Sequence, residues 1–309
     1  MSAFPPRVIG TYTSGQPGPL LFVIGGIHGN EPAGVSALRR VFDTLDEINP
    51  QIKGTLIGVR GNVKALVARE RFLDRDLNRL WSDAHVAEAR EKGSEGRSRE
   101  ENELLELMEL VETHFDGSHP REILVDLHTT SAPGGLFTII NSDAANRQLA
   151  SALHAPIIFG LTHALACTTN VFAAARDMEM LAFESGQHDD PAAVDNHEAA
   201  IWLLMEKAGC LAGADIPGFA EFHRRLIVAS KAIPRYLEVV HRHEIVAEDA
   251  FLMHPGFSNF HKVYQDEPLA RDARGEVLCP HSGLMLMPLY QPQGEEGFFI
   301  VRPLDAPPI

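Results

Sequence analysis

Two histidines and a glutamate stand at the ends of two apolar runs in this sequence. His28 and Glu31 follow the run at residues 20–26, and His128 follows the run at residues 123–125. A catalytic zinc ion takes three such ligands from a protein and keeps a fourth position open for water or substrate. Residues three apart lie on the same side of a turn or helix start. The three side chains therefore predict a metal site.

The spacing His-x-x-Glu is weak on its own, because this chain with 15 histidines contains it four times, at His28/Glu31, His85/Glu88, His119/Glu122 and His241/Glu244. Only the first pair leaves a predicted buried strand and enters a predicted helix. In an open α/β sheet, ligand sites form beyond the carboxyl ends of strands, which favours this pair together with His128. Asp126 and Asn30 are candidates to accept the second imidazole N–H, although a strand-end carboxylate and a turn residue would explain them equally well.

Glu184 is the candidate for acid–base catalysis. It ends the apolar run at residues 180–183 and precedes the small pair Ser185-Gly186. A carboxylate at a strand end can accept a proton from water and pass it to a leaving amine. A purely structural role is the alternative that the residues leave open.

The segment at residues 71–79 gathers three arginines and an asparagine in an otherwise acidic chain. Guanidinium groups bind carboxylates through paired hydrogen bonds and can stabilise an oxyanion. The segment therefore predicts anion recognition. The alternative is a surface patch of Arg–Asp ion pairs, which would contribute little stability.

Strands alternate with helices over the first two thirds of the chain. Apolar runs predict strands at residues 20–26, 55–59, 123–125, 136–140, 157–160 and 180–183, and helical spacing predicts helices at residues 33–45, 102–114 and 193–208. Residues 61–81 are predicted as a functional loop, and residues 84–101 as a solvated loop or exposed helix. This order predicts an α/β fold with a mainly parallel sheet and helices on both faces.

The pattern changes near residue 231. Short strand-like pieces follow at residues 236–240, 285–289 and 298–301, separated by Pro, Gly and Asp, and no helix is predicted among them. We therefore expect a small C-terminal β domain.

The composition limits the partners. The chain carries 42 Asp and Glu against 27 Lys and Arg, a net charge of -15, so its surface repels phosphate backbones and anionic membranes. We expect no nucleic-acid and no membrane partner. Three cysteines without a C-x-x-C pair are typical of reduced thiols, and the first residues do not form a signal peptide, so we expect a cytoplasmic location. The sequence leaves a homo-oligomer open.

Four motifs, in order, resemble the succinylglutamate desuccinylase/aspartoacylase family. They are GIHGNE at residues 26–31, DRDLNR at 74–79, DLHTTS at 126–131 and FESG at 183–186. The resemblance implies a zinc-carboxypeptidase-like catalytic domain at residues 1–230 and a β-rich domain at residues 231–309 that caps the cleft. It implies one zinc ion per chain, bound by His28, Glu31 and His128, with Glu184 as the general base and acid.

The same resemblance implies a substrate site. Arg71 would polarise the scissile carbonyl group, and Asn78 and Arg79 would bind a substrate carboxylate. Tyr290 is similar in place to a family tyrosine that reaches into the site. The family's aspartoacylases carry a further arginine before the catalytic glutamate, for which Arg176 is the nearest candidate here. The implied reaction is hydrolysis of a small anionic N-acyl amino acid to a carboxylate and a free amino acid.

Two other functions remain open from the sequence. A zinc carboxypeptidase acting on short peptides would use the same metal chemistry. A metal-binding regulatory protein would keep the metal site without turnover, but such a protein is expected to lose the base, and Glu184 is present.

Overall fold

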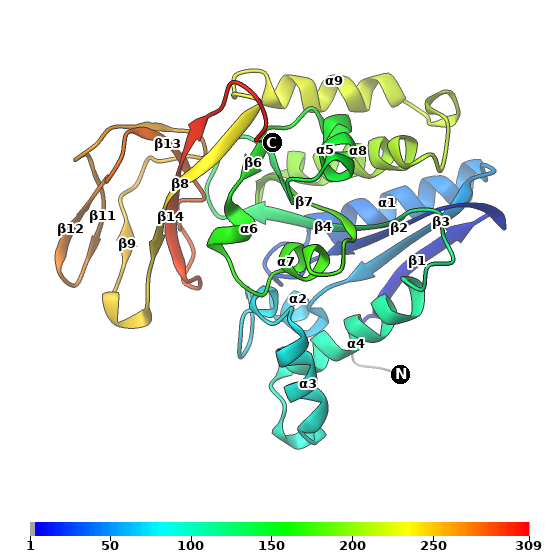
Figure 1. Cartoon of the computed structure of the whole chain (residues 1–309), viewed down its shortest axis with the longest axis horizontal. Helices are drawn as coiled ribbons and strands as arrows, with labels where there is room; N and C mark the ends of the chain where they lie inside the picture. Colours follow the sequence, from blue (N-terminus) through cyan, green and yellow to red (C-terminus); the bar gives the residue numbers. More distant parts are fainter. Residues whose placement is uncertain (1–3, 309) are drawn as a thin grey trace.

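The computed structural model describes residues 4–308 (Figure 1). Its strands are β1 (Val8–Thr13), β2 (Gln16–Gly25), β3 (Lys53–Arg60), β4 (Glu122–Thr130), β5 (Phe137–Ile140), β6 (Ile157–Phe159), β7 (Glu179–Gln187), β8 (Tyr236–Glu244), β9 (Leu252–Met253), β10 (Lys262–Val263), β11 (Pro268–Asp272), β12 (Gly275–Leu278), β13 (Gly283–Leu286) and β14 (Glu296–Pro303). Its α-helices are α1 (Ala33–Ile48), α2 (Val63–Ala68), α3 (Asp83–Glu91), α4 (Arg99–His114), α5 (Ala144–Ala150), α6 (Leu161–Ala164), α7 (Thr169–Ala174), α8 (Pro191–Ala208) and α9 (Phe219–Ser230).

Within residues 4–308, most strands join one 11-stranded sheet in the order β1-β3-β2-β4-β7-β5-β6-β8-β14-β13-β10. At its centre β2 pairs in parallel with β3 and β4, and β4 pairs in parallel with β7. β5 runs antiparallel to β7, and the β5–β6 and β6–β8 pairs are parallel again. The strands β8, β14, β13 and β10 finish the sheet in antiparallel pairs. The predicted α/β fold with a mainly parallel central sheet and C-terminal β structure is confirmed.

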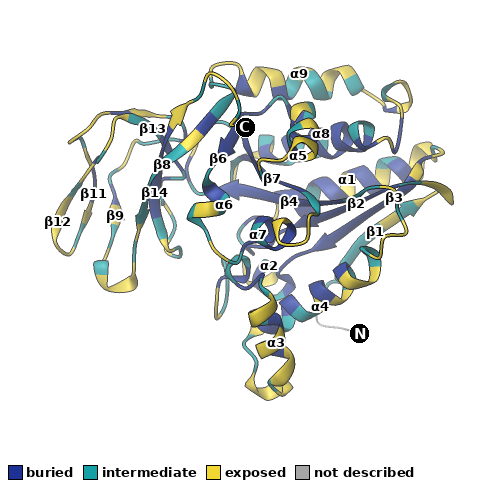
Figure 2. Ribbon diagram, in the orientation of Figure 1, coloured by how far each residue is buried: buried dark blue, intermediate teal, exposed yellow. Residues whose placement is uncertain are grey.

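Alternate residues of the central strands face two hydrophobic cores, one on each side of the sheet. Leu21 and Val23 join the core that α1 and α8 cover, whereas Leu20, Phe22 and Ile24 join the core that α4 and α7 cover. This is the period of two that a strand imposes. Figure 1 shows α1, α8 and α9 on one side of the sheet and α4 and α7 on the other, and Figure 2 shows the central strands buried between them.

Most of the predicted elements are present, and some are longer than the apolar pattern. α1, α4 and α8 correspond to the three predicted helices, and β4 and β7 extend to include His128 and Glu184. The sequence pattern does not predict β1 or α9, and it misses α2 inside the predicted loop. The expected solvated character of residues 84–101 is wrong at its end, because Glu100 and Glu101 are buried at the start of α4.

The C-terminal segment continues the main sheet. β8 pairs in parallel with β6, so the sheet runs across the predicted boundary at residue 230. Phe299 of β14 joins the core covered by α4, and Phe298 joins a third core beneath the three-stranded sheet β12-β11-β9. The division into residues 1–230 and 231–309 stays a prediction. As expected, residues 231–308 contain no α-helix.

None of the helices in the described part of the chain combines the length and the apolar character that crossing a membrane requires.

Candidate metal centre and active site

Three neighbouring strands bring the predicted site residues to one edge of the sheet. The turn between β2 and α1 carries His28 and Glu31. His128 lies near the end of β4, Glu184 lies near the end of β7, and the two are paired across these strands. Because β2, β4 and β7 run parallel, their carboxyl ends meet on the same side, as expected of a ligand site in an α/β sheet.

A glycine lets this turn pack closely. The backbone N–H of Gly29 donates to the carbonyl of Arg71 over 3.1 Å, and a Cβ at this position would collide with the backbone of Ala65 in α2. Pro32 then caps the start of α1, where its missing N–H removes no helix bond. The turn is therefore fixed between α2 and the segment that begins with Arg71.

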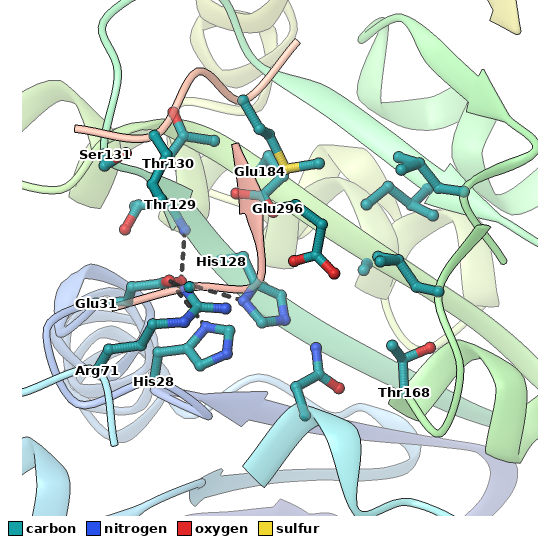
Figure 3. Close-up of a pocket in the computed structure, with 18 of the residues that line it drawn as sticks. His28, Glu31, Arg71, His128, Thr129, Thr130, Ser131, Thr168, Glu184 and Glu296 are labelled. Carbon is teal, nitrogen blue, oxygen red and sulfur yellow. Dashed lines mark hydrogen bonds and ion pairs between the residues drawn. The ribbon is translucent and has the colours of Figure 1, made fainter. Parts of the chain in front are cut away.

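The Glu31 carboxylate lies between the two histidines. Its Oε1 is 2.9 Å from His28 Nδ1 and its Oε2 is 3.1 Å from His128 Nδ1, and Figure 3 marks these contacts. The three side chains are buried and each offers one ligand atom within 4.8 Å of the other two. Two imidazoles and a carboxylate in this arrangement form a set that could hold a metal ion.

The outer nitrogens of both imidazoles face other carboxylates. His28 Nε2 lies 3.1 Å from Asp76 Oδ1, and His128 Nε2 lies 2.9 Å from Asp126 Oδ2. Such contacts fix the ring orientation and leave Nδ1 as the nitrogen that could bind a metal ion. Asp126 therefore occupies the predicted place. Asn30 does not, because its amide donates to a glutamine in the segment before β14, and Asp76 takes its place instead.

Glu184 faces the same cavity with one oxygen uncommitted. The cavity is lined by Glu184, His28, Glu31 and His128 among others, and Glu184 is buried. Its Oε2 has no hydrogen-bond partner among residues 4–308. Burial raises the pKa of Glu184 to about 7, with His128 opposing the shift. A carboxyl group with a pKa near neutrality can both accept and return a proton.

A buried glutamate holds the arginine-rich segment in place. The Glu100 carboxylate is fully buried and accepts three backbone N–H groups, from Leu73 at 2.8 Å, Asp74 at 3.0 Å and Arg75 at 3.1 Å. These bonds fix the chain between Arg71 and the short 3-10 helix at Leu77–Arg79. The segment is thus a rigid part of the site and not a loose surface loop.

Arg71 lines the cavity and binds two carboxylates of the metal centre. Its Nε and Nη2 donate to Asp76 Oδ2 over 3.2 and 3.0 Å, and its Nη1 lies 3.5 Å from Glu31 Oε1. Burial alone would raise the pKa of Asp76, but Arg71 and His28 hold that pKa well below its usual value. The negative charge of Asp76 therefore persists, and it links Arg71 to His28.

Asn78 and Arg79 also line the cavity, and both already have partners. Asn78 Oδ1 accepts the backbone N–H of Thr169 over 3.1 Å, so its amide is oriented. Arg79 Nη2 donates to Glu296 over 2.8 Å, and its Nε lies 3.6 Å from the Glu295 carboxylate. The arginine-rich segment thus contributes the three predicted residues to one cavity, although with counter-charges that the sequence does not predict.

The family model described as the succinylglutamate desuccinylase/aspartoacylase catalytic domain matches residues 17–187, more than half of the chain. The chain belongs to the succinylglutamate desuccinylase/aspartoacylase family. The match spans the metal-site turn, the arginine-rich segment, β4 and β7, which are the four places where the sequence motifs lie.

Individual relatives match over shorter stretches. A succinylglutamate desuccinylase from Pseudomonas paraeruginosa is 32% identical over 111 residues, which are 35% of this chain and 30% of that protein. A probable aspartoacylase from Parasynechococcus marenigrum is 32% identical over 136 residues, 42% of this chain and 41% of that protein. The chain thus matches less than half the length of these relatives.

Solved structures of the succinylglutamate desuccinylase/aspartoacylase family match nearly the whole chain. A succinylglutamate desuccinylase/aspartoacylase from Rhodobacter sphaeroides gives a TM-score of 0.66 at 17% identity, covering 94% of this chain and 87% of that chain. Murine aminoacylase 3 gives a TM-score of 0.58 at 19% identity, covering 94% and 95%. At these identities the likeness shows the fold, including the C-terminal β structure.

Two residues suggested by the family resemblance do not line the cavity. Arg176 lies over the Phe172 ring, 3.7 Å from its centroid, and pairs with Asp83. Tyr290 is 37% exposed, and its hydroxyl donates to the carbonyl of His254 over 2.6 Å. Both side chains are engaged elsewhere, so we assign neither to substrate binding.

The structure adds site residues that the sequence motifs do not single out. His188 lies 2.7 Å from Thr129 Oγ1 through Nδ1 and 3.1 Å from Gln291 Oε1 through Nε2, and burial lowers its pKa. Gln291 and Glu296 reach the cavity from the segment before β14 and from its first residue. His188 could have been suggested by its position in the sequence, four residues after Glu184 and directly after β7. The two tail residues carry none, because only long-range pairing brings them here.

Proposed function

We propose that this protein is a zinc-dependent hydrolase that cleaves the amide bond of a small N-acyl amino acid, giving a carboxylate and a free amino acid. The observation that carries the proposal is one cavity lined by a buried three-residue metal set and by a further buried carboxyl group, Glu184, whose Oε2 makes no hydrogen bond. Membership of the family supports the reaction class, since relatives are named as a desuccinylase and an aspartoacylase.

The residues fit a zinc ion, which His28, Glu31 and His128 would hold. Both histidines turn Nδ1 toward Glu31 and have Nε2 held by a carboxylate, the orientation expected of imidazole ligands. Zinc so bound would supply a Lewis acid and lower the pKa of a water molecule.

Glu184 would move the proton. Its carboxylate would accept a proton from the attacking water as the water oxygen bonds to the amide carbon. The same carboxyl group would then return that proton to the amine nitrogen as the carbon–nitrogen bond breaks. Burial favours this return, because it raises the pKa of Glu184 to about 7.

Arg71 and the Asn78–Arg79 pair would bind the two polar ends of the substrate. Arg71 is charged, buried and within 3.5 Å of Glu31, so its guanidinium can stabilise charge that develops on the carbonyl oxygen. Asn78 and Arg79 can bind the carboxylate of the amino-acid part.

The segment between β13 and β14 favours a small substrate over a peptide. Met287, Leu289, Gln291 and Gly294 of this segment line the cavity, and Ser131 donates to the carbonyl of Pro288 over 3.3 Å. This segment adds a wall to the cavity, which supports a small substrate over a long peptide. A metal-binding regulatory protein is the other candidate, and the uncommitted Glu184 oxygen argues against it.

The test is a substrate screen with zinc-loaded protein. N-acetyl, N-formyl and N-succinyl amino acids and short peptides are incubated with the protein, and released amine is measured. We expect release from N-acyl amino acids, loss of release with a chelator, and loss in Glu184→Gln. Preferential cleavage of peptides would favour the carboxypeptidase, and no release from any compound would overturn a hydrolase.

A further inference from the structure

Part of the cavity wall is apolar. The contributing side chains come from β5, β7, α6 with its C-cap, β14 and the residue after β13: Ile139, Ala182, Leu161, Leu165, Phe299 and Met287. All six belong to the core that α4 and α7 cover or pack against it. The wall is therefore held by the body of the protein. Such a surface stabilises an apolar group and penalises a charged one that lacks a partner.

The backbone at Met287 shows that this wall is specifically shaped. Met287 has a left-handed conformation, with φ of 48°, which a side chain other than glycine adopts at some cost. Its N–H donates to Asn259 Oδ1 over 2.7 Å, and Asn259 in turn donates to Thr130 Oγ1 over 2.9 Å. The buried amide of Asn259 thus compensates for the strained backbone and fixes Met287 at the cavity.

The charges beside this wall cancel. Glu296 Oε2 accepts from Arg79 over 2.8 Å, and Glu296 Oε1 accepts from Arg242 over 2.9 Å. Both oxygens of this largely buried carboxylate are thus occupied by guanidinium groups. Figure 3 shows the Glu296 carboxylate pointing into the space between His128 and Thr168.

This pairing limits which substrate charges find a partner. A cationic side chain beside this wall would meet a carboxylate whose charge is already balanced by two guanidinium groups, Arg79 and Arg242. A second substrate carboxylate would need a second guanidinium, and Arg71 is already bound to Asp76 and Glu31. Arg79 is the remaining guanidinium that lines the cavity, and its charge is already shared with Glu296 at 2.8 Å and Glu295 at 3.6 Å. The cavity can therefore satisfy one carboxylate, and the Glu296 charge repels another.

We propose that the substrate carries a single carboxylate and an apolar side chain, and that Glu296 determines this choice by occupying Arg79 at the edge of the apolar wall. The proposal rests on the proposed amide hydrolysis and names its substrate class. Glu296 is a specificity-determining residue, because it excludes acidic side chains by repulsion and by holding the guanidinium that would attract them.

The test ranks substrates of zinc-loaded enzyme by kcat/KM. N-acetyl-leucine, N-acetyl-methionine, N-acetyl-aspartate and N-acetyl-lysine vary the side chain, and N-succinyl-leucine adds a second carboxylate on the acyl side. We expect the first two to exceed each of the other three by at least about tenfold, the scale of discrimination by an apolar pocket. This ranking by the unmutated enzyme decides the proposal without any variant.

The variant Glu296→Gln keeps the shape of the side chain and removes its charge. We expect kcat/KM for N-acetyl-aspartate to rise about tenfold or more relative to N-acetyl-leucine, because Arg79 is released. Glu295→Gln is the matched control, since this neighbouring carboxylate is 62% exposed and lies farther from Arg79, and it should leave the ratio unchanged.

The outcomes distinguish the proposed substrate class from the proposed amide hydrolysis on which it rests. Preference for N-acetyl-aspartate, N-acetyl-lysine or N-succinyl-leucine would overturn the apolar substrate while leaving amide hydrolysis intact. An unchanged ratio in folded Glu296→Gln would overturn the role of Glu296. Failure to hydrolyse any N-acyl compound would overturn both proposals.

Discussion

We expect turnover to depend on Glu184 and metal binding to be independent of it. Glu184 lies near the carboxyl end of β7, and its Oε2 makes no hydrogen bond. The two histidines are oriented by Asp76 and Asp126, so the orientation of the metal ligands does not depend on Glu184. We expect Glu184→Gln to retain bound zinc and to lose about 100-fold or more in kcat, the usual scale for general acid–base catalysis. Turnover of a purified variant and its elemental zinc content are the two measurements.

A control for that variant lies at the other end of the same strand. Glu179 pairs with Arg121 over 2.6 Å, away from the cavity, and Glu179→Gln should retain kcat. Loss of zinc in Glu184→Gln would make Glu184 a ligand, and unchanged turnover would place the base elsewhere.

His197 should make the folded protein sensitive to acid. Its side chain is fully buried against Phe183, and burial lowers its pKa to about 3. Between pH 3 and its ordinary pKa of about 6.5, the unfolded chain binds a proton that the folded chain does not. Stability therefore falls as the pH drops through this window, by about 2 kcal/mol between pH 7 and pH 5.

The variant His197→Leu tests this linkage. It removes the titrating group, so its free energy of unfolding should fall about 2 kcal/mol less than that of the unmutated protein between pH 7 and pH 5. Denaturant unfolding of both proteins with a chelator present, so that metal binding does not contribute, is the measurement. Equal pH dependence in the two proteins would contradict a neutral buried His197.

At the scale of elements, the sequence predicts strands and helices best where the residue pattern of one segment reflects its own burial. The runs that become β2, β4 and β7 are apolar because both faces are buried, and α1 and α8 show helical spacing because one stripe is buried. His128 and Glu184 could be found because they directly follow such runs. The apolar pattern places the ends of β4 and β7 too early, because polar residues such as His128 and Glu184 lie inside these strands and interrupt the pattern.

Prediction fails where burial depends on a distant partner. Glu100 lies in a charged run that is predicted to be solvated, but it is buried and accepts backbone N–H groups from residues 73–75. The Arg79–Glu296 pair joins residues 217 apart, and no local pattern reports it. In the sequence, Asp76 is one of several charged residues in its segment. Its contact with His28 could not be predicted, because that contact depends on how the segment folds back toward the turn after β2.

The hydrogen bonds of Glu100 lead to a prediction about the arginine-rich segment. Glu100→Ala would leave the N–H groups of Leu73, Asp74 and Arg75 without this acceptor and release the segment that carries Arg71. We expect a loss of about 2–4 kcal/mol in unfolding free energy and a fall of about 10- to 100-fold in kcat/KM from misplacement. Denaturant unfolding and steady-state kinetics would measure the two effects.

An exposed glutamate on the same helix provides the control. Glu109 of α4 faces solvent, and Glu109→Ala should change neither stability nor kcat/KM appreciably. If Glu100→Ala were as active and stable as Glu109→Ala, the segment would be fixed by other contacts.

At the scale of the whole molecule, the proposed metal joins the centre of the sheet to its neighbouring turn. His28 and Glu31 follow β2, His128 belongs to β4, and these two strands lie side by side in the buried middle of the fold. Only the folded chain can bind an ion through all three residues, because unfolding separates His128 from His28 and Glu31. Zinc should therefore stabilise the entire domain and not only the cavity.

The expected size follows from mass action. Free zinc at about 100 times its dissociation constant adds about 2.7 kcal/mol to the unfolding free energy, which should raise Tm by on the order of 5 °C. Thermal unfolding of chelator-treated protein, before and after zinc is restored, measures this shift. His128→Ala should lose most of the shift and most of the bound zinc, whereas Glu184→Gln should retain both, because the role proposed for Glu184 is proton transfer and not metal binding. An equal shift in His128→Ala and the unmutated protein would mean that zinc binds elsewhere, and no shift in either would remove the metal from the proposed mechanism.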